Sequence, residues 1–293
     1  MKILVFGSLN IDHTYHLPHI NRPKETISAR SYDIAAGGKG LNQAIALAKT
    51  GEHVYLAGVL GTGAQLLEET MNRFNVDTSL LNRLPIPSGH AIIQIDDNSE
   101  NAIFIYAGSN GAVDKEYADK VLSNFEKGDL LIMQNEINLQ DYIIKKAHKK
   151  GMTILMNPSP CDEKLSKQPL ELVDYFFINE VEGELLTGFK KPEEILDGML
   201  KKYPGCHVIL TLGSDGACYK YGDEFARVEA RKVKAIDTVG AGDTFMGYFI
   251  YGLVKGFTPA QCLEIATKAS SITVQRKGAA QSIPTLEEVN ALD

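Results

Sequence analysis

Short apolar segments that alternate with helical patterns place the strongest constraint on the fold of this chain. Six segments are apolar, end at polar or glycine residues, and are expected to be buried β-strands. They are residues 2–7, Val54–Val59, Leu130–Gln134, Thr153–Asn157, Tyr175–Ile178 and Val208–Leu212. Helical patterns occupy residues 39–50, 64–74, 137–150 and 192–203. This alternation predicts an α/β fold, a three-layer α/β/α core with a mostly parallel central sheet covered on both faces.

Two segments interrupt the alternation, residues 12–36 and residues 88–106. The first contains extended stretches, and the second has the pattern of a hairpin. The stretches are His13–Leu17 and Ile27–Ile34, and the hairpin pairs Ala91–Ile95 with Ala102–Tyr106 through Asp97-Asn98-Ser99. We expect both segments to form a small β-sheet lid, while residues 1–11, 37–87 and 107–293 form the core. Because unpaired lid edges invite aggregation, a homodimer through the lid is expected.

Composition and charge exclude several classes of protein. The chain has 293 residues and a formal net charge of −7 with no basic tract, so a nucleic-acid partner has no electrostatic support. Four scattered cysteines without a CxxC pair argue against a disulfide framework or a zinc site. No apolar run is long enough for a membrane span, and the N-terminus has the pattern of a first strand rather than a signal peptide. A reducing cytoplasm is the expected location, with no membrane partner.

The turn Asp237-Thr-Val-Gly-Ala-Gly-Asp-Thr-Phe245 lies between an expected strand end and a helix start. Gly240 and Gly242 permit positive φ angles and close approach of a ligand to the backbone. The N–H groups of the following helix then point into the turn and make an anion site. Asp243 lies in the same turn, where a carboxylate is electrostatically awkward for a structural role. Phosphoryl transfer needs this combination, because one group must orient a hydroxyl beside donors for the developing phosphate charge.

Two polar motifs near the N-terminus are candidate ligand sites. Asn10 and Asp12 follow the first strand two residues apart, so they share one face and suit the vicinal hydroxyls of a sugar. An Asx turn in an ordinary loop explains them equally well. The run Ala36-Gly-Gly-Lys-Gly-Leu-Asn42 lacks the spacing of a P-loop. It is interpreted as backbone close to a small polar ligand, with Lys39 and Asn42 as donors, or as a helix start with structural glycines.

Two further motifs follow strands in the second half of the chain. Asn179 and Glu182 share a face of a first helical turn and suit a hydrated Mg²⁺. Taken alone, an N-cap with acidic residues in the first turn explains them better. The turn Thr211-Leu-Gly-Ser-Asp-Gly216 can pass close to the phosphates or ribose of a nucleotide. An ordinary strand-to-hairpin turn is equally plausible there on local grounds.

Taken together, these motifs resemble the PfkB family of carbohydrate kinases, and its ribokinase group, from residue 3 to about residue 290. Gly37-Gly38-Lys39-Gly40-x-Asn42-Gln43-Ala44 is similar to the first signature of the family, and Asp237 to Phe245 is similar to the second. Asn179-x-x-Glu182 lies between the two. The resemblance implies a ribokinase-like fold and an ATP-dependent sugar kinase.

The resemblance also implies a role for each matching position. Asp243 matches the catalytic base, and Gly240, Ala241 and Gly242 match the anion hole. The sugar-binding positions are Asn10, Asp12, Gly38, Lys39, Gly40, Asn42, Glu136 and Asp243. The nucleotide-binding positions are Asn179, Thr211, Leu212, Gly213, Ser214, Asp215, Gly216, Gly242 and Thr267. Asn179 and Glu182 match residues that organise Mg²⁺ through water. The positions for a monovalent cation, usually K⁺, are Asp237, Val239, Thr273, Arg276, Gly278 and Ser282.

The expected reaction transfers a phosphoryl group from ATP to O5 of D-ribose and yields D-ribose 5-phosphate, with Mg²⁺ and K⁺ as cofactors. Kinases for another furanose or a nucleoside, such as deoxyribose, adenosine or pseudouridine, are the alternatives within this class. A non-catalytic sugar sensor on the same fold is the alternative outside it. A sensor has no need for the base, so the presence of Asp243, Asn179 and Glu182 favours the enzyme.

Overall fold

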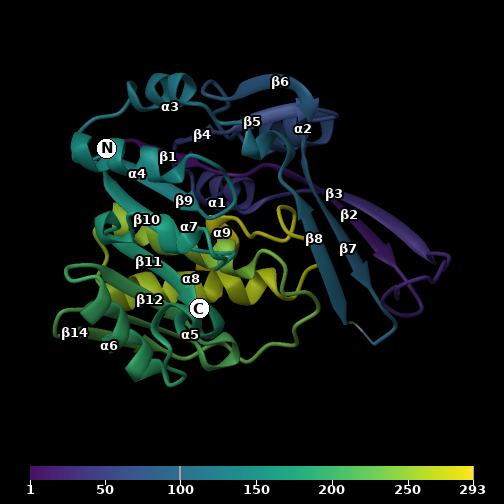
Figure 1. Cartoon of the computed structure of the whole chain (residues 1–293). Coiled ribbons are helices and arrows are strands. Elements are labelled where there is room, and N and C mark those ends of the chain that lie inside the picture. The colour runs from purple at the N-terminus through teal and green to yellow at the C-terminus, as the bar shows by residue number, and fades with distance from the viewer. Residues whose placement is uncertain (99, 293) are drawn as a thin grey trace.

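The computed structural model describes residues 1–98 and 100–292 of the chain, and Figure 1 shows its course. Ser99, at the predicted hairpin turn, and Asp293 lie outside the described residues. The strands are β1 (Ile3–Phe6), β2 (Asn10–His16), β3 (Ser31–Gly37), β4 (Val54–Ala57), β5 (Val59–Thr62), β6 (Asn82–Pro87), β7 (Gly89–Ile95), β8 (Asn101–Tyr106), β9 (Leu130–Gln134), β10 (Thr153–Asn157), β11 (Tyr175–Asn179), β12 (His207–Thr211), β13 (Ala217–Tyr221) and β14 (Glu224–Val228). The α-helices are α1 (Lys39–Ala48), α2 (Gln65–Arg73), α3 (Lys115–Leu122), α4 (Gln140–Lys150), α5 (Glu180–Thr187), α6 (Pro192–Lys202), α7 (Ala241–Val254), α8 (Pro259–Thr273) and α9 (Leu286–Asn290). Short 3₁₀ turns span Gly108–Gly111, Leu165–Lys167, Leu170–Leu172 and Gly213–Asp215.

The central sheet has eight strands in the order β14-β13-β12-β11-β10-β9-β1-β4. Pairing is parallel from β4 through β12 and antiparallel for β13 and β14. The four residues of β1 are all buried, as expected for a parallel strand covered on both faces. The carboxyl ends of the parallel strands therefore meet along one edge, where ligands bind in folds of this class.

Two apolar clusters lie on opposite faces of the central sheet and confirm the predicted three layers. One joins alternate strand residues such as Val5 and Ile132 to helices α1, α7 and α8. The other joins Leu4 and Leu131 to helices α3, α4 and α6. Consecutive residues of one strand thus enter different cores, which is the consequence of side chains alternating across a pleated strand. Within the described ranges, no helix is both long and apolar enough to span a lipid bilayer.

A second, four-stranded sheet in the order β3-β2-β7-β8 projects from the core beyond the strand ends (Figure 1). The predicted hairpin is present, because β7 and β8 pair antiparallel from His90–Tyr106 to Ile95–Asn101. The two predicted segments join through β2 and β7, which are parallel. The small sheet of the prediction is therefore confirmed. Of the two stretches predicted in its first segment, His13–Leu17 falls largely within β2, whereas Ile27–Ile34 becomes a strand only from Ser31 onward.

One predicted strand was wrong in its extent. The apolar run Val54–Val59 is interrupted at Gly58, whose N–H donates to the Tyr117 hydroxyl at 2.9 Å. Residues before the glycine form β4 in the central sheet, whereas β5 after it pairs with β6 in a separate two-stranded sheet. Hydrophobicity alone does not reveal this change of partner, because most of β4 and the first half of β5 are both buried.

Candidate active site

The predicted site residues gather where the central strand ends meet the amino ends of two helices. The chain leaves β1 and enters β2, which carries Asn10 and Asp12, while Glu136 follows β9. Helix α1 begins at Lys39 and α7 at Ala241. Hydrogen bonds between side chains of their first two turns join the two helices at this point.

Asp243, the predicted base, is buried in the first turn of α7. Its Oδ2 accepts a hydrogen bond from Asn42 Nδ2 at 3.1 Å, and its Oδ1 accepts one from Gln43 Nε2 at 2.9 Å. Burial raises the pKa of Asp243, while Lys39 and the two amide donors act in the opposite direction. The carboxylate is thus fixed in orientation and binds a proton more readily than it does in water.

Lys39 lies among four carboxylates, those of Asp243, Glu136, Glu182 and Asp12. Burial is the largest single influence on its pKa and disfavours the ammonium ion, but the four carboxylates outweigh it. The pKa of Lys39 is therefore raised, and the side chain remains a cation. A fixed cation beside the amino end of α7 is suited to neutralise the charge of a phosphoryl group.

Asp12 and Glu136 add two acceptors to the cluster. Burial, followed by the charges of Glu136 and Asp243, raises the pKa of Asp12 to about 7 even though Lys39 lowers it. Burial likewise raises the pKa of Glu136, whose Oε2 accepts from the Ser8 hydroxyl and, at 3.2 Å, from the Lys39 N–H. Carboxyl groups with perturbed pKa values that converge in one place are candidates for a functional site.

The glycine-rich run before α1 packs directly against the connection between β1 and β2. A Cβ atom at Gly37 would lie 2.0 Å from Asp12 Oδ2, and one at Gly38 would lie 2.8 Å from the Asn10 backbone nitrogen. Gly38 caps α1 with a φ of 93°, which a residue with a side chain rarely adopts. The glycines therefore shape the start of the helix, and they also bring bare backbone against the polar residues of β2.

Asn10 and Asn42 use opposite ends of their side-chain amides to bind neighbouring residues. Asn10 Oδ1 accepts from Asn110 Nδ2 at 2.7 Å, which turns the NH₂ group of Asn10 in the other direction. Asn42 Nδ2 donates to Asp243, while the buried Oδ1 of Asn42 has no hydrogen-bond partner among the described residues. A buried acceptor without a partner costs free energy, which a donor from a bound ligand would offset. The Asx-turn interpretation of Asn10 is wrong, because its side chain pairs with a residue 100 positions away.

The turn before α7 has the geometry of an anion site. Gly240 begins the helix with a φ of 76°, and a Cβ atom there would lie 3.2 Å from Ala279 Cα. Gly242 is exposed, and among the described residues no atom lies within 4 Å of the place its Cβ would take. The first N–H groups of a helix have no partner within the helix. The Ala241 N–H donates to Thr238 O at 3.3 Å within the turn, and the Gly242 N–H lies next to it at the positive end of α7.

Asn179 and Glu182 form a capping box at the start of α5. Asn179 Oδ1 accepts from the Glu182 N–H at 2.9 Å, and Glu182 Oε2 accepts from the Asn179 N–H at 3.0 Å. The capping interpretation is therefore confirmed. The charge of Glu182 also contributes to the raised pKa of Lys39, so the start of α5 lies near the site. Within residues 1–98 and 100–292, no three acidic, histidine or cysteine side chains converge to bind a metal directly.

The segment from Thr211 to Gly216 is a tight turn between antiparallel strands. The Leu212 N–H donates to Gly216 O at 2.8 Å, and β12 and β13 pair beyond it, which confirms the hairpin interpretation. Gly213, Ser214 and Asp215 are exposed at the tip. The side chain of Leu212 is buried in the core, so only its backbone is available to a nucleotide.

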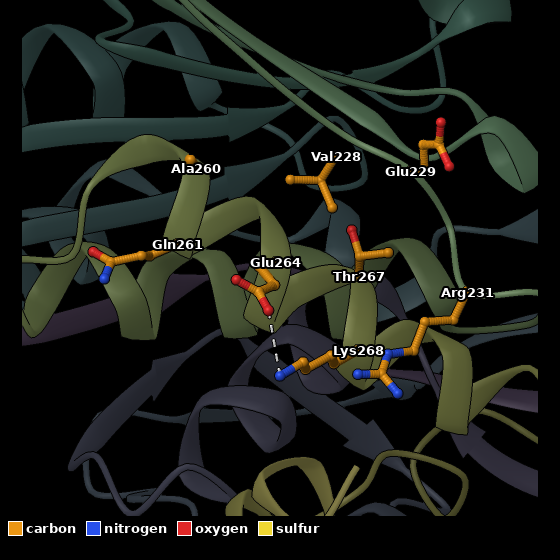
Figure 2. Close-up of a pocket in the computed structure, with 8 residues that line it drawn as sticks. All are labelled: Val228, Glu229, Arg231, Ala260, Gln261, Glu264, Thr267 and Lys268. Carbon is orange, nitrogen blue, oxygen red and sulfur yellow. Dashed lines mark ion pairs between the residues drawn. The ribbon is translucent and has the colours of Figure 1, made fainter. Parts of the chain in front are cut away.

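Thr267 lines a groove between α8 and the end of β14 with a volume of about 320 Å³ (Figure 2). The residues that line it are Val228, Glu229, Arg231, Ala260, Gln261, Glu264, Thr267 and Lys268. Thr267 is buried, and its hydroxyl has no hydrogen-bond partner among the described residues. One turn further along α8, the Ser270 hydroxyl donates to Ala241 O at 3.0 Å. The groove therefore leads along α8 toward the anion turn of α7.

The six predicted cation positions lie on two segments that the fold brings together. Asp237 Oδ2 accepts from the Gly278 N–H at 2.9 Å, and its Oδ1 accepts from the Val239 N–H at 3.0 Å. The Arg276 guanidinium pairs with Glu288 at 2.6 Å, so of Arg276 only the backbone can face a cation. Ser282 and Thr273 are buried beside this loop. These bonds hold the turn before α7 against the C-terminal tail.

Four residues of the site network were not predicted from the sequence: Ser8, Gln43, Asn110 and Gln134. Ser8 binds Glu136, and Gln43 binds Asp243. Asn110 orients Asn10, and Gln134 donates to Gln43 at 2.6 Å. Gln43 stands inside the first signature next to Asn42, so the motif itself was the available signal. The other three have no local pattern that separates them from ordinary strand ends and turns.

Comparison with known proteins places this geometry in one family. The model of the pfkB family of carbohydrate kinases matches residues 1–286. Ribokinase of Schizosaccharomyces pombe is 36% identical over 309 residues, covering 99% of this chain and 97% of its own length. Deoxyribokinase of Salmonella typhi is 30% identical over 301 residues, covering 99% and 98%. The structure of Arabidopsis thaliana ribokinase complexed with ribose and ATP has a TM-score of 0.87 and 28% identity, covering 99% and 98%. The chain therefore belongs to the pfkB family of carbohydrate kinases.

Proposed function

We propose that this chain is an ATP-dependent sugar kinase that phosphorylates D-ribose at O5. The single observation that carries the proposal is Asp243, a buried carboxylate oriented by two amides at the positive end of α7 and beside Lys39. This arrangement places a proton acceptor next to donors for a phosphoryl group, which is the requirement of transfer to a hydroxyl. The ribokinase relatives and the neighbour structure with ribose and ATP support the same substrates.

In the reaction, a bond forms between O5 and the γ-phosphorus, and the bond from that phosphorus to the β–γ bridging oxygen breaks, releasing ADP. The O5 proton passes to Asp243. In a loose transition state the proton leaves late, so Asp243 acts first by orienting the hydroxyl. The N–H groups of residues 240–243 hold the transferred group, with Gly240, Ala241 and Gly242 as the anion hole.

The sugar is bound between β2, the start of α1 and the residue after β9. We propose that carboxylates and amide groups there pair with its hydroxyls, and that Gly38 and Gly40 contribute backbone. The side chains are those of Asn10, Asp12, Lys39, Asn42 and Glu136. The partnerless Oδ1 of Asn42 and the raised pKa of Asp12 support this assignment, because both groups gain from a donating hydroxyl.

We propose that the nucleotide extends from the anion turn to the groove beside Thr267. The turn from Thr211 to Gly216 contributes backbone near its phosphates or ribose, together with Asn179 and Gly242. The partnerless hydroxyl of Thr267 and the volume of the groove support an adenosine end there.

Two cations complete the proposal. Asn179 and Glu182 would hold Mg²⁺ through its waters, and Mg²⁺ would supply charge neutralisation for the transferred phosphoryl group. K⁺ would be held by the segments that carry Asp237, Val239, Thr273, Arg276, Gly278 and Ser282, mainly through backbone carbonyls. The hydrogen bond from Gly278 to Asp237 supports this site, because it holds the two segments side by side.

The second sheet, residues 12–36 and 88–106, is proposed as a lid over the sugar and as the surface of a homodimer. Strand alternation places His13 and Tyr15 on the face opposite Asn10 and Asp12. Cross-strand pairs place Tyr32, Ile34, Tyr106 and Phe104 on that same outer face. These four side chains are between 48% and 59% exposed, which is an apolar patch that a second copy would cover. The four free cysteines are compatible with the proposed cytoplasmic location.

Deoxyribose is the second candidate substrate, since one relative of nearly equal length is a deoxyribokinase. A coupled ADP-release assay with ribose, deoxyribose and nucleosides, with and without K⁺, tests the proposal. Ribose is expected to give the highest kcat/KM. Asp243→Ala should lower kcat by roughly 10²–10⁴ with ribose binding mostly kept. Turnover like that of the wild type in this variant would contradict the assignment of the base, and no sugar-dependent ADP release would favour a sensor.

A further inference from the structure

The amide of Gln43 joins the candidate base to the interior of the sheet. Gln43 is fully buried in the second turn of α1, and its Nε2 donates to Asp243 Oδ1 at 2.9 Å. Its Oε1 accepts from Gln134 Nε2 at 2.6 Å. Gln134 is also fully buried, at the end of β9. A continuous chain of hydrogen bonds therefore runs from the central sheet through Gln43 to Asp243.

The bonds to Gln134 and Asp243 together fix which way the side-chain amide of Gln43 points. A glutamine amide has a donor side and an acceptor side, and only the donor side can bind a carboxylate. Because Gln134 donates to the oxygen of Gln43, the NH₂ group of Gln43 must turn toward Asp243. Gln134 itself packs on bare backbone, since a Cβ atom at Gly7 would lie 2.1 Å from Gln134 Oε1. Gln134 Oε1 has no hydrogen-bond partner among the described residues, so packing and the bond to Gln43 hold the Gln134 amide in place.

We propose that Gln43, oriented by Gln134, is a positioning residue for catalysis that keeps Asp243 ionised and its Oδ1 fixed. Asn42 binds the other oxygen, but Asn42 also has a partnerless Oδ1 and belongs to the proposed sugar site. Its amide is therefore engaged with the ligand as well. Gln43 has no such second task in the structure, because both ends of its amide are taken by Asp243 and Gln134. The inference rests on the proposed function, since it concerns the base of that reaction.

Charge near Asp243 explains why a neutral donor is needed there. Lys39, from the start of α1, favours the ionised form of Asp243, while Asp12 from β2 and Glu136 after β9 are like charges in the same cluster. Burial works against ionisation as well. A donor to the carboxylate stabilises its charged form, so loss of Gln43 would leave Asp243 protonated to higher pH. Glutamate at position 43 would add a further negative charge and remove the donor.

The test uses the full chain with saturating ATP, Mg²⁺ and K⁺, and with the sugar that supports the highest turnover. The pH dependence of kcat and the sugar KM are measured for wild type, Gln43→Met and Gln134→Met. In Gln43→Met the acid limb of kcat should move upward by about one pH unit, the effect of one lost donor to a carboxylate. The plateau of kcat should fall by about 10- to 100-fold from loss of orientation. The sugar KM should change little, and Gln134→Met should show the same changes to a smaller extent.

Gln140→Met is the matched control. Gln140 is equally buried and donates to Asn135 Oδ1 and Ile137 O, so it makes no bond to a carboxylate of the site. Its acid limb should remain where the wild type has it, and thermal melting compares the folding of all variants. An unshifted acid limb in folded Gln43→Met, or an equal shift in Gln140→Met, overturns the inference while leaving the kinase intact. If Gln43→Met does not fold, Gln134→Met decides alone. A wild type without sugar-dependent ADP release overturns the proposed function instead.

Discussion

At the scale of single residues, Asp12 is expected to favour sugar binding while it lowers the stability of the unliganded fold. The pKa of Asp12 is about 7 in the folded chain and near 4 when unfolded. Between these pH values the folded chain binds more protons, so the contribution of Asp12 to the free energy of unfolding falls as pH rises. Asp12→Asn removes this loss. At pH 8 we expect the unliganded variant to melt about 2–4 °C above the wild type, with no such gain at pH 4.

The same substitution should weaken ribose binding, because an amide replaces a carboxylate acceptor. Thermal melting at both pH values and ribose titration by calorimetry measure the two effects on one sample. A variant that melts below the wild type at pH 8 would show that Asp12 is not under electrostatic strain. A variant that binds ribose as tightly as the wild type would remove Asp12 from the sugar site.

The convergence of site residues was predictable where the chemistry requires several groups in a short run of sequence. Asp243 beside two glycines and Lys39 before Asn42 have such local patterns, and the structure brings them together. Asn110 and Gln134 do not, because they act on residues 100 and 91 positions away, respectively. For Asn179 the sequence left two interpretations open, an N-cap and a Mg²⁺ site. The capping box is enough to explain why Asn179 and Glu182 stand at these positions. Only the effect of the Glu182 charge on Lys39 links the start of α5 to the site.

At the scale of elements, the outer face of the second sheet is proposed to pair two copies of the chain. Phe104 on β8 is 59% exposed and lies on this face. A carboxylate at the centre of an apolar interface is costly to bury without a partner. Phe104→Asp should therefore be monomeric at micromolar concentration, whereas the wild type is expected to be dimeric; analytical ultracentrifugation measures both.

Phe225→Asp is the matched control for this prediction, because Phe225 is 53% exposed but lies on β14 at the far edge of the central sheet. It should remain dimeric. Dissociation of both variants would point to general destabilisation, and a monomeric wild type would contradict the dimer.

The second sheet itself was predictable from alternation and turn residues. The pairing of β2 with β7 was not predictable, because no local sequence pattern identifies the parallel partner of a strand when that partner lies far away in the sequence.

At the scale of the whole molecule, the proposed cation site depends on the tail returning to the turn before α7. Asp237 binds the Gly278 N–H across 41 residues and also holds the Val239 N–H. Asp237→Asn keeps the shape but replaces one acceptor oxygen by a donor group, so one of these bonds is lost. If the paired segments hold K⁺, the K⁺ concentration for half-maximal kcat should rise by about 10-fold or more in this variant, as for lost supporting bonds around a metal.

Asp223→Asn, at an exposed hairpin turn, is the control and should leave that K⁺ concentration unchanged. Kinase assays over a K⁺ series at constant ionic strength measure both variants. A wild type with equal kcat in K⁺ and in a large organic cation would remove K⁺ from the mechanism, whereas equal K⁺ dependence in wild type and Asp237→Asn would place the cation elsewhere.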